Sequence, residues 1–295
     1  MRTGIFKDGK LTKQEPGAYR FGSFTIKDHA KVEFLSDKTL VFDTLELHYR
    51  AVLIGHSLSI ISNDIHVHFA GDISLTGHGN GPGQGEGAGQ PSGQFGSGAG
   101  HGAPGGSRSG GGGAAYGLTR SPLDSGSGGG NGTSSVGGAG GGFLNITVLK
   151  TFNLEGTVHV DGANGTSSFS GGGSGGTVLL TVGSLKGHGR LSCDGGQGKG
   201  GGGSGGRLRL WLGDRFEFAG DITAFGGDDG TGDLSHFKAG PGTIYIQHGR
   251  RLSQPQTKLW ITGNTQRSQQ KQTNTVISGT DVTDFEYNEV KLAGM

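Results

Sequence analysis

Clusters of glycine recur through the second half of the chain, and a strand-like segment follows each of them. These segments begin at Phe143, Thr177, Arg207 and Thr243, at separations of 34, 30 and 36 residues. Each one alternates apolar and polar residues, which is the pattern of a half-buried strand. A repeat of this length predicts a solenoid or a propeller, because one unit alone cannot bury its apolar face.

Each unit offers two strand-like runs, which favours a solenoid, since a propeller blade needs four strands in about 40 residues. We expect the apolar positions to point inward and to stack from unit to unit. They are Leu144, Ile146, Val148, Val178, Leu180, Val182, Leu208, Leu210, Leu212, Ile244 and Ile246, with Val158, Val160, Leu191, Cys193, Ile222 and Ala224 from the second runs. We therefore predict an all-β fold, a right-handed parallel β-helix with long glycine-rich loops.

The sequence predicts a single domain over residues 1–295. Residues 1–76 alternate in the same way with few glycines, which indicates tighter coils, and residues 143–292 carry the repeats of about 30–36 residues. The N-terminal inward pairs are predicted at Phe24/Ile26, Val32/Phe34, Leu40/Phe42, Leu45/Leu47, Val52/Ile54, Leu58/Ile60, Ile65/Val67 and Ile73/Leu75.

Residues 77–142 form a glycine-rich insertion in which 29 of 66 residues are glycine. A structureless loop of that length is uncommon in a compact domain. Two alternatives stay open. One is a disordered insertion. The other is ordered polyglycine strands in the polyproline II form, with polyglycine-II packing on the solenoid that glycine permits through close backbone approach.

Composition excludes several classes of protein. The formal net charge of +1 gives no excess that favours a nucleic-acid partner or a membrane surface. There is no apolar run near the ~20 residues that span a bilayer, so we expect no direct membrane insertion. A single cysteine excludes an internal disulfide framework. The N-terminus lacks the apolar core of a signal peptide, so the chain is either cytoplasmic or an excerpt of a longer secreted protein, and its abrupt end favours the excerpt.

The order of elements in the insertion is distinctive. The run 98–106 contains His101 and Pro104, and it is followed by Tyr116-Gly117, Ser121-Pro122 and the cluster 126–130. Together with the Asp-Gly-bearing strands that follow, this stretch resembles the glycine-rich β-solenoid repeat regions of very large, mostly uncharacterised, adhesin-like cell-surface or matrix proteins. The resemblance covers about residues 60–292. It implies an extracellular, structural or adhesive role and supplies no catalytic residues.

One outward patch is a candidate binding site. Arg207, Arg209, Trp211 and Tyr245 are predicted to lie on one solvent-facing sheet in adjacent coils. Arginine with aromatic residues is typical of binding surfaces, and aromatic faces suit sugar rings. The alternative is a solvated face with ordinary cross-strand pairs. Glycans or other matrix proteins are the partners that the sequence suggests.

Other motifs carry less chemistry. Sequons at Asn131, Asn145 and Asn164 are glycosylation candidates, although about 1.5 would arise by chance in so Ser/Thr-rich a chain. No HxxxH pair or His/Cys cluster predicts a metal site or a cofactor, and His66 and His68 are expected to face solvent. Cys193 is expected to be a buried small apolar residue. Asp161 and Asp194 are expected at turns.

The sequence favours a non-catalytic structural or adhesive module of a larger extracellular or cell-surface protein. A carbohydrate-binding or carbohydrate-cleaving β-helix is the alternative. Cleavage would need clustered carboxylates with a basic partner, and no such constellation is evident in the sequence. An ice-binding role would need a regular ladder of threonine, which Arg, Trp and Tyr interrupt.

Overall fold

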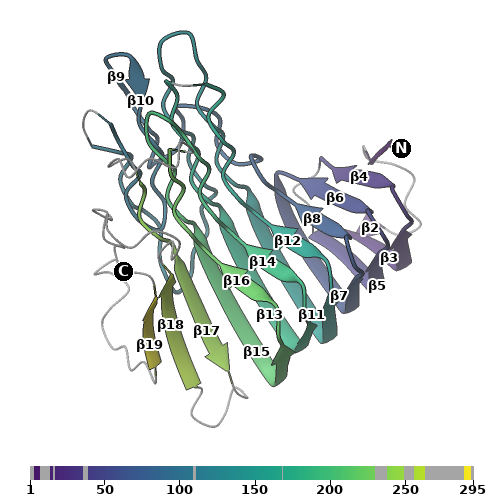
Figure 1. Ribbon diagram of the computed structural model, residues 1–295. Coiled ribbons are helices and arrows are strands. Elements are labelled where there is room, and N and C mark those ends of the chain that lie inside the picture. Colours follow the sequence, from purple (N-terminus) through teal and green to yellow (C-terminus); the bar gives the residue numbers. More distant parts are fainter. Residues whose placement is uncertain are drawn as a thin grey trace.

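The computed structural model describes residues 3–6, 14–15, 17–35, 39–108, 111–167, 169–229, 238–248, 256–262 and 289–293. Over these residues the chain is all-β and contains no helix (Figure 1). In the part of the chain so described, no helical segment is long and apolar enough to cross a membrane. The predicted fold class is therefore confirmed at the level of an all-β protein with parallel sheets.

One sheet is built from short strands that all run parallel, and we call it the short-strand sheet. Its order is β1 (Thr3–Phe6), β4 (Lys31–Phe34), β6 (Val52–Gly55), β8 (Asp72–Ser74), β12 (Thr157–His159), β14 (Arg190–Ser192) and β16 (Asp221–Thr223). The strands of later repeats have only three residues because glycine-rich segments follow them immediately.

The second large sheet, the long-strand sheet, contains strands of up to 12 residues. Its order is β2 (Gln14–Glu15), β3 (Ala18–Ile26), β5 (Thr39–Leu47), β7 (Ser57–Val67), β11 (Phe143–Leu154), β13 (Thr177–Gly187), β15 (Arg207–Phe218), β17 (Thr243–His248), β18 (Gln256–Thr262) and β19 (Glu289–Ala293). Pairing is parallel except at β2/β3 and at β17/β18. A small antiparallel pair, β9 (Pro91–Ser92) with β10 (Phe95–Gly96), lies at the tip of the glycine-rich part in Figure 1.

The chain alternates between the two sheets from β3 to β17, one long strand followed by one short strand. The apolar core therefore lies between the sheets. The register agrees with the predicted stacking, since Leu144, Val178, Leu208 and Ile244 pair in a continuous row. The inward residues predicted for the repeats are buried or, for Ile222, packed against the core.

One predicted pair is out of phase. Leu53, rather than Val52 and Ile54, aligns with Val32 and Ile73 and is fully buried. The run Val52–Gly55 begins with three consecutive apolar residues, so alternation could not set its phase.

The insertion interrupts the chain and leaves the sheets continuous. β7 pairs directly with β11, and β8 pairs with β12, although residues 77–142 separate them in the sequence. β8, which begins at Asp72, therefore occupies the same position as the second strands of the later repeats. In Figure 1 the glycine-rich segments of the insertion and of the repeats leave the sheets at the same end and run together as a bundle.

The segment 170–176 shows how the bundle is held together. Its backbone N–H groups donate to three other segments in turn, and the acceptor recurs at every third residue. The acceptors are Gly130 and Ser127 for Gly171 and Ser174, Gly201 and Ser204 for Gly172 and Gly175, and Ala163 and Val160 for Gly173 and Gly176. A β-strand has only two neighbours and alternates between them, so this segment is not part of a sheet.

The carbonyl groups of residues 171–174 accept bonds from three further segments. The donors are the N–H groups of Gly138 and Gly141, of Ala99 and of Gly196. The segment is therefore bonded both to residues of the insertion and to residues of the repeats. Within the described residues, the insertion is hydrogen-bonded to the repeats, which matches the packed alternative for residues 77–142.

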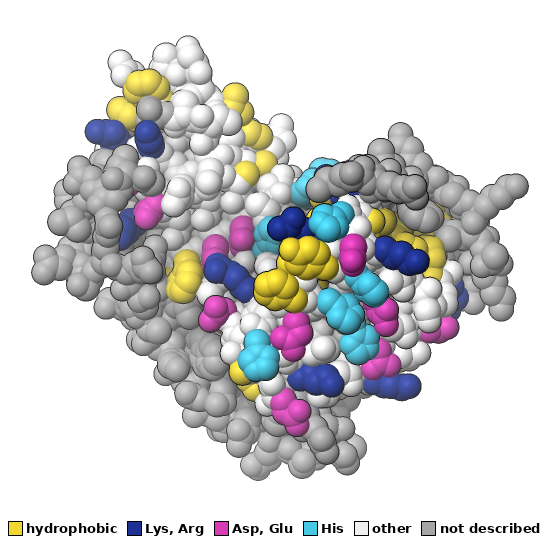
Figure 2. All heavy atoms as spheres, turned by 45° about the vertical axis from the view of Figure 1, so that its right-hand side comes forward, with side chains coloured by type: hydrophobic (Ala, Val, Ile, Leu, Met, Phe, Trp, Pro, Cys, Tyr) yellow, Lys and Arg dark blue, Asp and Glu magenta, His cyan; other side chains and the backbone are white. Residues whose placement is uncertain are grey.

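Side chains are nearly absent from the centre of this bundle because there is no room for them. A Cβ on Gly172 would overlap the carbonyl oxygen of Gly196, and one on Gly173 would overlap that of Ala139. In the space-filling view, charged and histidine side chains gather over the sheets, whereas much of the glycine-rich part is white, the colour of backbone and of uncharged polar side chains (Figure 2). Close backbone approach is thus what the glycine clusters provide.

Candidate functional site

The predicted Arg/Trp/Tyr patch does not form one solvent-facing surface. Arg207 and Tyr245 are each only 1% exposed, and Arg209 and Trp211 are half-buried. The alternation did predict which residues turn away from the core. It did not predict that the insertion covers this face of the long-strand sheet at Arg207. The predicted patch was therefore wrong for Arg207 and Tyr245, and only Arg209 and Trp211 remain partly accessible. The Arg209 guanidinium lies 5.2 Å from the centre of the Trp211 ring.

Arg207 instead fastens the insertion to the sheet. Its guanidinium donates to the Tyr116 carbonyl from Nε at 3.0 Å and from Nη2 at 2.7 Å. Nη1 donates to the hydroxyls of Thr119 at 3.0 Å and Thr243 at 3.3 Å. A buried cation is tolerated only when its donors are satisfied, and here the partners are backbone carbonyls and hydroxyls.

His101 completes this buried cluster. Its ring stacks on Tyr116 at 4.6 Å between centroids, and its Nδ1 lies 2.7 Å from the carbonyl oxygen of Gly175. Burial, and then the nearby charge of Arg207, lowers the pKa of His101 to about 3. The imidazole is therefore neutral at physiological pH, and burial also raises the pKa of Tyr116. In this cluster, neutral carbonyl, hydroxyl and ring groups surround the charged Arg207 guanidinium. These contacts stabilise the packing of the insertion on the sheet.

A polar ladder runs across the exposed face of the short-strand sheet, between successive repeats. His159 Nε2 lies 3.0 Å from Asp72 Oδ2, and its Nδ1 lies 2.8 Å from the Thr76 hydroxyl. Burial alone lowers the pKa of His159, but the hydrogen bonds and charges of Asp161 and Asp72 outweigh it and raise the pKa to about 9. At neutral pH, His159 is therefore a cation between two carboxylates.

The two aspartates expected at turns stack in adjacent repeats. Asp161 Oδ1 accepts the N–H of Asp194 at 2.7 Å, and Asp194 Oδ1 accepts the N–H of Phe225 at 2.7 Å. Arg190 Nη2 lies 2.5 Å from Asp194 Oδ2. Burial, followed by the charge of Asp161, raises the pKa of Asp194. These carboxylate oxygens accept hydrogen bonds from backbone N–H groups of the next repeat, and they therefore link adjacent repeats.

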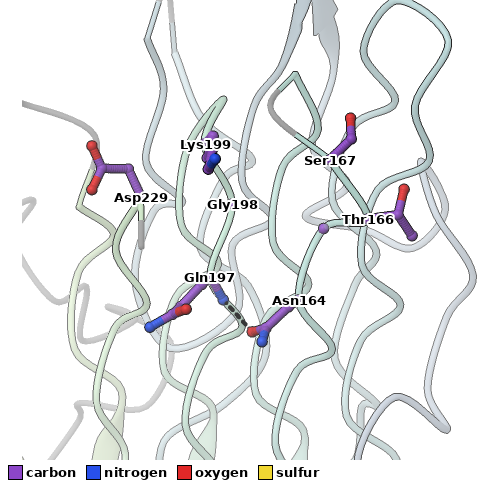
Figure 3. Close-up of a pocket in the computed structure, with 8 residues that line it drawn as sticks. Asn164, Thr166, Ser167, Gln197, Gly198, Lys199 and Asp229 are labelled. Carbon is purple, nitrogen blue, oxygen red and sulfur yellow. Dashed lines mark hydrogen bonds between the residues drawn. The ribbon is translucent and has the colours of Figure 1, made fainter. Parts of the chain in front are cut away.

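A polar groove opens on the glycine-rich bundle, and it is the candidate site that best fits a ligand. It has a volume of about 350 Å³ and is lined by Asn164, Gly165, Thr166, Ser167, Gln197, Gly198, Lys199 and Asp229. These residues come from three neighbouring segments, with Lys199 on the central one (Figure 3). The lining offers amides, hydroxyls, one ammonium and one carboxylate, and no aromatic ring, which suits a polar, hydroxyl-rich ligand.

The groove is held in shape by bonds between repeats. Asn164 Oδ1 accepts the N–H of Gln197 at 2.7 Å, and Gly165 N–H donates to the Gln197 carbonyl at 2.8 Å. Gly198 N–H in turn donates to Asp228 at 2.9 Å. This groove is not among the sites predicted from the sequence. Its only sequence signal is a polar residue, Asn164 or Gln197, three positions after the aspartate of each Asp-Gly turn.

No family model, curated protein or solved structure matches the chain.

The three sequons lie in different surroundings. Asn131 and Asn164 are exposed, whereas Asn145 is half-buried in the middle of β11. Asn131 Oδ1 accepts the N–H of Gly137 at 2.9 Å, so both exposed asparagines use their oxygen internally. Because Asn164 lines the groove, we expect glycosylation there to compete with a ligand in the groove.

Proposed function

We propose that the chain is a rigid, non-catalytic structural or adhesive module of a larger extracellular or cell-surface protein. In this proposal the two sheets are the walls of a right-handed parallel β-helix. The strict alternation of long and short strands between two parallel sheets supports it. Crossover connections between parallel strands are nearly always right-handed, which supports the handedness.

The observation that carries the proposal is the three-residue period of donors in the segment 170–176. A polyproline II helix has three residues per turn, so successive N–H groups point in three directions. We infer that the glycine-rich segments are polyglycine-II helices packed side by side, each bonded to several neighbours. Cross-linking in three directions gives a stiff body, in contrast to a flexible glycine linker.

Such a body suits a mechanical or adhesive role. It projects from one end of the sheets and exposes turns and loops at its tip (Figure 1). In this proposal, its stiffness keeps those turns and loops at a fixed distance from the core. Glycans and matrix proteins are the partners proposed for these surfaces. The exposed sequons at Asn131 and Asn164 are compatible with an extracellular location.

The test is to immobilise the chain and measure both the retention and the cleavage of matrix polysaccharides and matrix proteins. The proposal expects saturable retention of one class without any release of reducing ends or unsaturated sugars. Cleavage of a retained polysaccharide would contradict the non-catalytic role. A lack of retention across the panel would contradict the adhesive role.

A second candidate function, carbohydrate binding in the polar groove, is favoured by its lining of amide and hydroxyl groups. If it is correct, Gln197→Ala and Lys199→Ala weaken retention of a bound glycan at least tenfold. Trp211→Ala is the matched comparison, because Trp211 belongs to the patch predicted from the sequence and lies outside the groove lining. Loss of retention in Trp211→Ala alone would assign the glycan to the long-strand sheet instead.

A further inference from the structure

Three successive turns stack at the ends of β3, β5 and β7, and histidines gather there. His48 follows β5, His68 follows β7, and Glu46 lies near the end of β5. The turns are bound to one another through backbone hydrogen bonds, from His48 N–H to Ile26 and from His68 N–H to Leu47. Histidine and acidic side chains are grouped together on the face shown in Figure 2.

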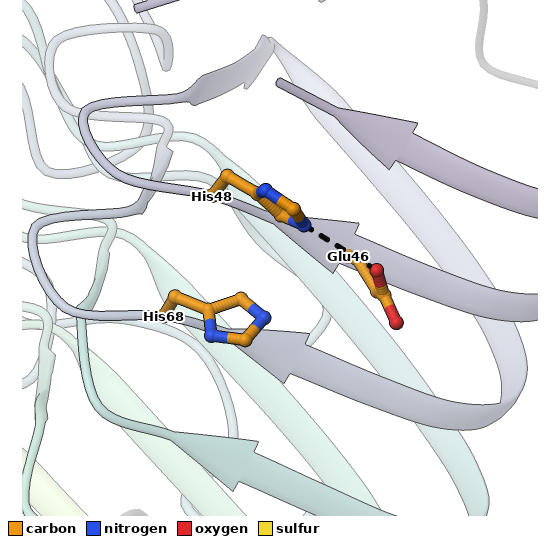
Figure 4. A group of neighbouring side chains, drawn as sticks. All are labelled: Glu46, His48 and His68. Carbon is orange, nitrogen blue, oxygen red and sulfur yellow. Dashed lines mark hydrogen bonds and ion pairs between the residues drawn. The ribbon is translucent and has the colours of Figure 1, made fainter. Parts of the chain in front are cut away.

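The side chains of Glu46, His48 and His68 converge (Figure 4). His48 Nε2 lies 3.4 Å from Glu46 Oε2, and one ligand atom from each of the three residues lies within 4.8 Å of the others. The rings of His48 and His68 are 5.0 Å apart between centroids and steeply inclined. In a tetrahedral zinc site with bonds of about 2.0–2.1 Å, ligand atoms lie roughly 3.3–3.4 Å apart. The Glu46–His48 separation already has this value, and the His68 ligand atom, which lies within 4.8 Å of the other two, has to move closer to reach it.

A second carboxylate, that of Asp28, lies near the other ring nitrogen of His48. Asp28 Oδ1 lies 3.8 Å from His48 Nδ1, on the side of the ring opposite the nitrogen that faces Glu46. Histidines that bind a metal through one nitrogen commonly donate the other N–H to a carboxylate, which orients the ring and makes it a better ligand. Asp28 comes from the turn before, and at 3.8 Å its carboxylate is close enough for an ion pair with His48 but has to move nearer to accept a hydrogen bond.

We propose that Glu46, His48 and His68 bind one divalent transition-metal ion, with Asp28 orienting His48. Two imidazoles and one carboxylate suit Zn²⁺, and also Cu²⁺ or Ni²⁺, better than Ca²⁺ or Mg²⁺, which prefer oxygen ligands. Three protein ligands leave a coordination position open to water on this half-exposed surface. The site is independent of the proposed adhesive role and lies on the Gly-poor N-terminal strands.

The chain provides a matched control. His188 Nδ1 lies 3.4 Å from Glu155 Oε2, and these residues follow β13 and β11 as His48 and His68 follow β5 and β7. In the part of the chain that the structure describes, this pair belongs to no group of three potential ligands. The pair thus reproduces one His–Glu contact without a third ligand.

The test is calorimetric titration of the untagged full chain with Zn²⁺, with Co²⁺ absorption as a spectroscopic probe of coordination. One saturable Zn²⁺ site per chain is expected, with intense visible Co²⁺ bands typical of four-coordinate geometry. His48→Gln and His68→Gln should each weaken Zn²⁺ affinity at least tenfold. Glu46→Gln should weaken it as well, and His188→Gln should leave it within twofold of the original chain.

Two results would overturn the proposal. One is the absence of saturable Zn²⁺ binding, and the other is binding that survives both His48→Gln and His68→Gln unchanged. Thermal unfolding without metal checks that the variants fold. These side chains lie at the surface, so equal melting temperatures are expected in the absence of Zn²⁺, and a rise with Zn²⁺ is expected only where the three ligands are intact.

Discussion

At the residue scale, Arg207 shows how a side chain predicted to contact solvent becomes structural. Its guanidinium satisfies the Tyr116 carbonyl and two threonine hydroxyls beneath the insertion. The sequence correctly indicated the side of the sheet on which Arg207 lies, because Leu208 and Leu210 mark the core side. The sequence could not indicate that the insertion covers Arg207, because the covering residue Tyr116 is about 90 positions away in the chain.

We expect Arg207→Ala to destabilise the fold by about 3 kcal/mol, because buried carbonyls and hydroxyls lose their partner. Arg209→Ala is the matched control on the same strand and the same face. Arg209 is half-buried and contacts the ring of Trp211, so its loss should cost about 1 kcal/mol or less. Urea unfolding of both variants measures the difference. Equal effects would mean that the Arg207 cluster does not fasten the insertion.

His159 gives a pH dependence whose sign follows from its raised pKa. The folded value of about 9 lies above the ordinary 6.5, so the protonated form stabilises the fold. This contribution is fully present below about pH 6.5 and is lost as the pH rises through 9. With charge-assisted bonds to Asp72, it should amount to about 2 kcal/mol.

The measurement is urea unfolding at pH 6.5 and pH 9.5 for the original chain and for His159→Gln. The original chain should lose stability over this interval more steeply than the variant. Identical slopes would show that His159 does not carry a charge between its aspartates in the folded protein.

At the element scale, the strands of the repeats were predictable and the glycine-rich segments were not. The strand starts at Phe143, Thr177 and Arg207 fall in one register, as their spacing predicted. Apolar alternation carries this information. Glycine has no side chain and therefore no pattern, so the pairing of Ala99 with Gly172 has no signal in the sequence. The hydrogen-bond partners of such a segment therefore become known only from the backbone geometry.

The close packing of these segments predicts that a single methyl group is costly. A Cβ on Gly175 would overlap the carbonyl oxygen of Cys193 and crowd the backbone nitrogen of Gly206. Gly175→Ala should therefore lower the free energy of unfolding by about 2 kcal/mol. Gly111 has no atom within 4 Å of the added Cβ, so Gly111→Ala should stay within about 0.5 kcal/mol.

Chemical denaturation of the two glycine variants distinguishes a packed bundle from loose loops. In a packed bundle the two substitutions differ in the stated way. If Gly175→Ala were as neutral as Gly111→Ala, the segment would have room to move, and close backbone packing would be refuted at that position.

At the scale of the whole molecule, the chain combines two kinds of packing. The sheets bury apolar side chains such as Leu144 and Leu210 between them. The glycine-rich bundle buries backbone against backbone, and serines within it, such as Ser174 and Ser204, are themselves fully buried and accept N–H bonds from Ser127 and His101. The Arg207 cluster joins the two parts. The glycine-rich part is thus held by backbone hydrogen bonds and buried serines, and the rigidity proposed for it rests on these bonds.

The most direct test of the polyglycine-II body is residue-resolved hydrogen exchange of the native full chain over 97–130 and 171–176. Every amide from Gly171 to Gly176 donates a hydrogen bond, so consecutive amides should all be protected to the level of β11 and β13. Protection of alternate amides only would indicate an edge strand. Exchange within seconds across these residues would show flexible loops and would contradict the rigid module proposed here.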